Sequence, residues 1–388
     1  MKLNHENMEM IEFFHRLPFE RNMDEKTKNC FREIYDIVKE APSFRFANNP
    51  RDGIVFTLNG ILQGIEESEY LPRKIARYVN SQKKEHLQYN VFQDGRHIFI
   101  HFIVFNKSSR KKYDEYAKHM LRVLFTLNHF SHKKCAKSKE FHIYVYMTPF
   151  VKLLPVDEHI GADHVNTGVN KKDWRCSDHE EVNEIVIFRE EDWFKVFIHE
   201  SIHSFRLDFT DTAAKEIKML FPVKSEVNLF EAYTEFWAKM LNMLFCSIFL
   251  EKKNQFDKVM EIMNLLIRVD IKYSLFQVVK VLHFMGLTYS DLIDGRNLER
   301  YAEDTNVLAY FVLNMCLMNH YNFFIECCKK NSHNVLNFNE SRHLVDFIKT
   351  WYNEKTLLND VEKMEQVFER VKDARLLKNM KMTLFELK

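Results

Sequence analysis

The segment EIVIFREEDWFKVFIHESIHSF, residues 184–205, changes partway from the pattern of a strand to that of a helix. Residues 185–188 are β-branched or aromatic, and the run is short enough for a buried strand. The acids Glu190, Glu191 and Asp192 then stand where the N-terminus of a helix favours negative charge. We therefore predict a buried strand that leads into a helix.

Two histidines of this predicted helix, His199 and His203, are four residues apart and therefore share one helical face. Two imidazoles in this arrangement can bind one zinc ion, and Glu200 beside them can act as a general base toward water. A lone histidine among apolar residues is more often a hydrogen-bonded core residue, but an acid in the same surroundings needs a reason to be there. The His-Glu-x-x-His pattern thus indicates a zinc site.

A zinc site of this kind needs a third protein ligand. The continuation His-x-x-Gly-x-x-His is excluded because Arg206 and Phe209 occupy the positions of its glycine and last histidine. The next candidates are Glu231 and Glu235, four residues apart on one face of a mostly apolar segment. Two acids there are costly without a cation or hydrogen-bond donors. Glu226 stays open as a third choice, and the alternative for the pair is two solvated helix acids.

The stretch Glu231-Ala-Tyr-Thr-Glu235 matches Glu-Ala-x-Ser/Thr-Asp/Glu, and with His-Glu-x-x-His it resembles the gluzincins, the thermolysin-like clan of zinc peptidases. The resemblance implies one Zn²⁺ ion held by His199, His203 and Glu231, with Glu200 as the base. It also implies that Glu235 accepts a hydrogen bond from a ligand histidine and fixes its tautomer.

A tyrosine or histidine from the C-terminal part commonly stabilises the oxyanion in such enzymes. Tyr310 is our candidate for this role, with His320 and Tyr233 as alternatives, although core packing is the commoner role for each of them.

Residues 188–209, together with His164–Asn170, also look similar to proteins of large nucleocytoplasmic DNA viruses that are assigned as metallopeptidases from their sequences. Residues 1–150 carry no matching motif. The resemblance implies a viral protein of the host cytoplasm or the virion, whose substrate is a peptide or protein. The alternatives are a non-catalytic structural or interaction protein, virion-associated, that retains a zincin fold, and a zinc hydrolase acting on something other than peptides.

Composition limits the partners and the compartment. The 388 residues include 56 basic and 55 acidic side chains, so a formal net charge of +1 provides no general basic surface for nucleic acid. The seven cysteines are scattered without a Cys-x-x-Cys pair, which indicates reduced thiols. The N-terminus has no apolar core of signal-peptide length, and residues 240–250 and 307–325 are too short or too interrupted to span a bilayer. We expect a cytoplasmic protein without a membrane partner.

Glycine and proline divide the chain into two kinds of structure. All seven prolines lie at or before Pro222, and only Gly286 and Gly295 follow Gly168, so the C-terminal half should be nearly all helix. The expected helices are 230–252, 256–269, 274–284, 305–328, 342–352 and 357–371. Earlier, strands at 97–105 and 141–147 flank a helix at 113–130, and residues 8–40 are helical with a break near Pro18. A further strand is expected at 54–58 and a loop at 43–53.

Together these patterns predict a mixed α+β, zincin-like fold, in which a small sheet leads into the motif helix and a mostly helical part follows. The expected divisions are an α/β region of unknown role at 1–150, a sheet edge with the motif helix at 151–210, and a helical domain with the third zinc ligand at 211–388. Residues 165–170 are either an edge strand that binds an extended substrate or a surface loop that turns at Gly168.

Overall fold

The computed structural model describes residues 4–19, 21–44, 72–106, 109–131, 140–156, 159–171, 182–209, 213–338 and 340–386. The predicted strand at 54–58 and most of the predicted loop at 43–53 lie outside these residues. The fold is mixed α+β, rich in helix and with one five-stranded mixed sheet.

The chain forms two compact units, and neither is one continuous segment. The sheet unit comprises Glu33–Val151 and Asn166–Leu207, and the helical unit comprises Met1–Arg32, Lys152–Val165 and Asp208–Lys388. The three-part division predicted from the sequence stays a prediction.

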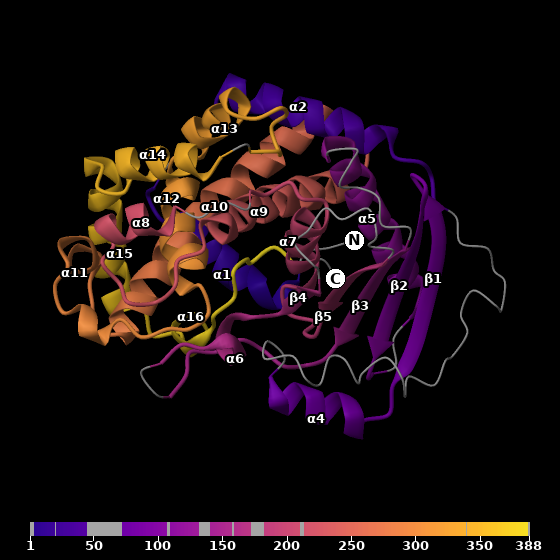
Figure 1. Ribbon diagram of the computed structural model, residues 1–388, viewed down its shortest axis with the longest axis horizontal. Coiled ribbons are helices and arrows are strands. Elements are labelled where there is room, and N and C mark those ends of the chain that lie inside the picture. The colour runs from indigo at the N-terminus through magenta and orange to yellow at the C-terminus, as the bar shows by residue number, and fades with distance from the viewer. Residues whose placement is uncertain are drawn as a thin grey trace. The chain divides into compact units, whose positions relative to one another are not determined.

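The sheet unit contains five strands in the order β1-β2-β3-β5-β4, seen side by side in Figure 1. β2, β3 and β5 are parallel, whereas β1 and β4 run antiparallel at the two edges. The strands are β1 (Glu85–Gln93), β2 (Arg96–Val104), β3 (Glu140–Met147), β4 (Gly168–Lys171) and β5 (Val182–Ile187). α5 (Arg110–Phe130) connects β2 to β3, which confirms the predicted β-α-β unit.

Helices pack on both faces of this sheet. On one face, Trp193 from the start of α7 (Trp193–Ser204) packs edge-on against Phe102 of β2 and lies 4.7 Å, centroid to centroid, from the ring of Tyr116 in α5. On the other face, α4 (Arg73–Ser81) buries Ile75 and Val79 against residues of β2, β3 and β5. The predicted strand before the motif is β5, and α7 follows it within a few residues.

The helical unit is built around two long helices that pack together, α9 (Leu229–Leu250) and α10 (Phe256–Phe284). The prediction of two separate helices at 256–269 and 274–284 was wrong. α10 is one helix that continues through Asp270 and Lys272. Both side chains are buried yet satisfied: Asp270 pairs with Lys239, and the Lys272 Nζ donates to the carbonyls of His15 and Leu17.

The predicted helix at 305–328 is also divided. Residues Leu308–Leu313 form a π-helix, η3, which continues into α12 (Asn314–Asn319), and α13 (Tyr321–Lys330) begins after a break at His320. The remaining elements of the unit are α1 (His5–Arg16), the first part of α2 (Glu25–Glu40), α6 (Ala162–Val165), α8 (Ala214–Leu220), α11 (Tyr289–Asp294), η2 (Leu298–Arg300), α14 (Ser341–Trp351), α15 (Lys355–Arg370) and α16 (Ala374–Lys378).

Two further findings concern the whole described chain. Within the described ranges, no helix combines the length and apolar character that crossing a membrane requires. The five cysteines in these ranges, Cys30, Cys246, Cys316, Cys327 and Cys328, form no disulfide.

Candidate metal centre

α7 brings the two motif histidines together. The Nε2 atoms of His199 and His203 are 3.1 Å apart, because residues four apart in a helix lie one turn above each other. His199 is buried and His203 is half-buried. Both rings thus present the same ring nitrogen to one point.

The motif acid lies in a nearly closed environment. Glu200 is buried, with 8% of its surface exposed. Its main-chain carbonyl accepts a hydrogen bond from the Asn170 Nδ2 at 3.0 Å, and the same amide donates to the Ser204 Oγ at 2.7 Å. Asn170 of β4 therefore fixes the edge strand to the helix that carries Glu200.

Glycine is required at the first position of β4. A Cβ at Gly168 would lie 2.7 Å from the Val196 Cγ1 and 3.5 Å from the Glu200 Cγ. Any side chain there would force the strand away from α7. Sequence reasoning placed Gly168 and Asn170 in a candidate edge strand but did not find these contacts, which join residues about 30 apart in the chain.

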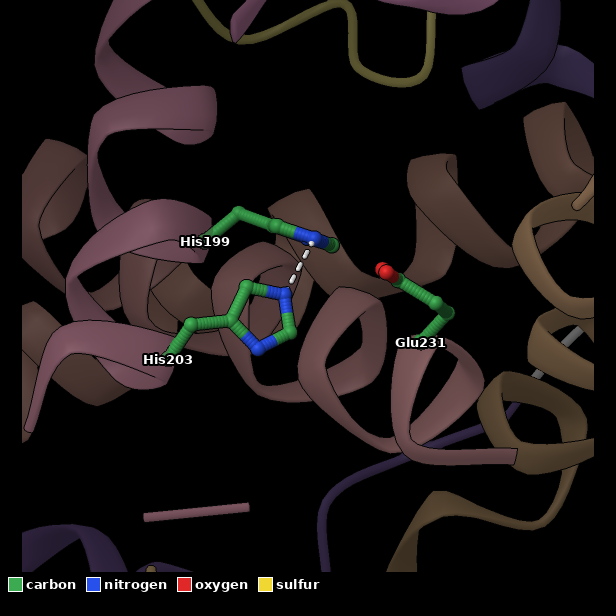
Figure 2. A group of neighbouring side chains, drawn as sticks. All are labelled: His199, His203 and Glu231. Carbon is green, nitrogen blue, oxygen red and sulfur yellow. Dashed lines mark hydrogen bonds between the residues drawn. The ribbon is translucent and has the colours of Figure 1, made fainter. Parts of the chain in front are cut away.

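Glu231 lies in the first turn of α9 and is half-buried. Its Oε2 accepts a hydrogen bond of 3.0 Å from the Tyr310 hydroxyl. Among the described residues, His199, His203 and Glu231 are the group of histidine, cysteine and acidic side chains whose potential ligand atoms all lie within 4.8 Å of one another (Figure 2).

This donor set fits a zinc ion. Two Zn–N bonds of ordinary length at a tetrahedral angle separate the nitrogens by about 3.3 Å, close to the 3.1 Å between the Nε2 atoms here. Two imidazoles and one carboxylate are also the ligand types of catalytic zinc sites that keep one position open. The other two acids considered for the third ligand, the exposed Glu226 and the buried Glu235, are outside this group.

Glu235 lies one turn beyond Glu231 on α9 and is fully buried. One turn further, the Lys239 Nζ forms a buried salt bridge of 2.8 Å with the Asp270 Oδ2 and donates to the Ser274 Oγ. Burial raises the pKa of Asp270, the Lys239 ammonium opposes that shift, and the negative charge of Glu235 adds to it. Glu235 is therefore close enough to interact with this pair, while its predicted bond to a ligand histidine stays a prediction.

The three candidate oxyanion donors have partners of different kinds. The Tyr233 hydroxyl is fully buried and donates to the Leu336 carbonyl. The His320 Nδ1 lies 3.0 Å from the Cys316 carbonyl, and its ring packs at a tilt of 31° against the ring of Trp351. Of these three, Tyr310 is the one that forms a hydrogen bond to a residue of the candidate metal centre, Glu231.

No family model matches this chain, and neither the curated proteins nor the solved structures include a significant match to it. The interpretation of the site therefore depends on its geometry and on the chemistry of its residues.

Proposed function

We propose that this protein is a zinc-dependent metallopeptidase of the gluzincin type, with His199, His203 and Glu231 as the metal ligands. The observation that carries the proposal is the grouping of these three potential ligands beside Glu200. A chance His-Glu-x-x-His sequence gives no reason for an acid 28 residues beyond the second histidine to belong to the same group.

Zinc, when bound, supplies a Lewis acid that polarises the substrate carbonyl and lowers the pKa of water toward neutrality. The Glu200 carboxylate accepts the proton of the attacking water and delivers it to the leaving amine. Its burial keeps competing water away from this proton transfer, and the Asn170 bond to its main chain fixes its helix against β4.

β4 is suited to bind the substrate main chain. It is the last strand in the sheet order and pairs with β5 on one side. An extended peptide can add to such an edge through main-chain hydrogen bonds, which would align its backbone beside α7. Binding of an extended main chain at this edge would favour peptide bonds over small esters or amides as the substrate.

The test combines metal content with turnover. Purified protein should contain one zinc ion per chain and cleave members of a peptide library. Glu200→Gln should retain the zinc and lose about 10²- to 10⁴-fold in kcat, because only the proton transfer is removed. Glu190→Gln serves as a matched control, since Glu190 precedes α7 and pairs with Lys112 on the surface.

The outcomes separate the alternatives. One zinc per chain without turnover on any peptide would favour a structural or interaction protein. Full activity in Glu200→Gln would disprove the assignment of the base. Absence of zinc after reconstitution would exclude the metallopeptidase altogether.

A further inference from the structure

Tyr310 lies outside the motif and is joined to the candidate centre by a hydrogen bond to Glu231. We propose that Tyr310 is a positioning residue, which holds the carboxylate of Glu231 in the conformation that binds zinc through one oxygen. This inference rests on the proposed zinc site. It gives Tyr310 a role different from that of the oxyanion donor expected from the sequence.

The hydrogen bond acts on one oxygen of the carboxylate. The Tyr310 hydroxyl donates to the Glu231 Oε2 at 3.0 Å, so a lone pair of this oxygen is already engaged when a cation binds. A hydrogen bond to an ionised carboxylate is about twice as strong as one between neutral groups. It therefore fixes the rotation of the carboxylate and disfavours binding through both oxygens.

Tyr310 is placed by an unusual backbone. It lies in the π-helix η3, whereas α12 directly after it is α-helical. A π-helical turn contains an extra residue, which changes the direction of its side chains. Such turns are rare in proteins, and those that occur often lie at functional sites. The irregular turn falls at the tyrosine that reaches Glu231, 79 residues away in the sequence.

A second bond joins the same two helix starts. Asn228 immediately precedes α9 but makes no capping bond to that helix. Its Nδ2 instead donates to the Asn306 Oδ1 at 2.8 Å, and Asn306 has a positive φ of 57°. The Asn306 carbonyl in turn accepts from the Tyr310 main-chain N–H. The starts of α9 and η3 are thus tied twice, at Asn228–Asn306 and at Glu231–Tyr310.

The turn before η3 is itself rigid. The buried Glu303 accepts hydrogen bonds from the main-chain N–H groups of Thr305 and Val307, at 2.8 Å and 3.2 Å. Tyr310 also borders a small space of about 10 Å³ that is lined by Lys239 and Phe311 as well. A space of this size holds about one water and not a phenol ring.

The proposal is tested by zinc affinity. Tyr310→Phe keeps the ring and removes the hydroxyl, and loss of such an outer partner weakens metal binding about 10- to 100-fold. Tyr289→Phe is the matched control: it also removes one hydroxyl of the helical unit, which donates to the Tyr352 carbonyl. Zinc dissociation constants are measured by competition with a chromophoric chelator, after unfolding curves show that both variants fold.

The visible spectrum of the cobalt-substituted protein is a second readout, which a general loss of stability would not change. Tyr310→Phe frees the carboxylate to bind through both oxygens, so the added coordination should weaken and shift the cobalt bands. Tyr289→Phe should leave the spectrum unchanged. If Tyr310→Phe does not fold, Asn306→Gly carries the test, because glycine tolerates the positive φ while the bond to Asn228 is lost.

The outcomes distinguish this inference from the proposed function. If the wild type binds zinc, His199→Ala abolishes binding, and Tyr310→Phe matches Tyr289→Phe in affinity and spectrum, the positioning role alone is overturned. If Tyr310→Phe lowers turnover but not zinc affinity, Tyr310 acts on the substrate and the positioning role is likewise wrong. If the wild type binds no zinc, both the inference and the proposed function fail.

Discussion

His101 provides a quantitative test of the sheet unit, because its ring must remain neutral in the folded protein. It lies on the α4 face of β2 and is 4% exposed, with its Nδ1 2.9 Å from the His86 Nε2 and its ring stacked on Tyr144. Burial, together with the neighbouring rings of His86 and His142, lowers the pKa of His101 to about 3. Protonating His101 therefore opposes folding.

The sign and size follow from linkage. The pKa of His101 is 6.5 in an unfolded chain and about 3 when folded. Between these values the unfolded chain binds more protons, so this residue's contribution to stability is lost as the pH falls below 6.5. Between pH 7 and pH 5 the free energy of unfolding should fall by about 2 kcal/mol because of His101 alone.

Urea unfolding at pH 7 and pH 5 measures this loss. The wild type should lose about 2 kcal/mol more on acidification than His101→Gln does, whereas His97→Gln, at an exposed position of the same strand, should behave as the wild type. An equal loss in the wild type and in His101→Gln would refute the argument that this ring is buried and neutral.

Three further predictions concern packing, charge and metal. Gly168→Ala should lower the free energy of unfolding by about 1–3 kcal/mol, measured by thermal unfolding, because its Cβ would overlap the Val196 Cγ1. Adding Val196→Ala to this variant should restore part of the loss. Unchanged stability of Gly168→Ala would contradict the close approach of β4 to α7. Asp270→Asn leaves the Lys239 ammonium buried without its counterion and should lower the free energy of unfolding by about 3 kcal/mol or more. The control Asp257→Asn, at an exposed ion pair, should lower it by less than about 1 kcal/mol. Similar losses for the two variants in urea unfolding would contradict the buried pair. Removing zinc with a chelator should lower the melting temperature, since a ligand at 100 times its Kd adds about 2.7 kcal/mol to the free energy of unfolding. Calorimetry with and without chelator measures this change, and an unchanged melting temperature would contradict a bound zinc ion.

Local patterns predicted much of the fold. The change at residues 184–205 from a β-branched run to helical spacing identified β5 and α7, because both signals arise within neighbouring residues. The break near Pro18 between α1 and α2 and the β-α-β unit around α5 were identified in the same way.

Elements that depend on distant partners were missed or divided wrongly. α10 looked like two helices because Asp270 and Lys272 are charged, and their partners come from residues remote in the sequence. β1 was missed because its sequence EHLQYNVFQ mixes polar and apolar residues. The Asp94-Gly95 turn, where both residues have positive φ, was the local signal that could have revealed its hairpin with β2.

The candidate site divides in the same manner. His199, Glu200 and His203 are evident because one helical turn places them. The bond between Tyr310 and Glu231 could not be predicted, because it joins residues 79 apart and depends on the π-helical turn at Tyr310. A π-helix has no sequence pattern comparable to the spacing of an α-helix.

We propose that two imidazoles and one carboxylate hold a single zinc ion. An anomalous difference map from crystals of the zinc-loaded protein, recorded on both sides of the zinc edge, tests it most directly. We expect one peak about 2 Å from the Nε2 atoms of His199 and His203 and from one oxygen of Glu231. A peak bound by other residues, or a peak at the histidines with Glu231 out of reach, would contradict it.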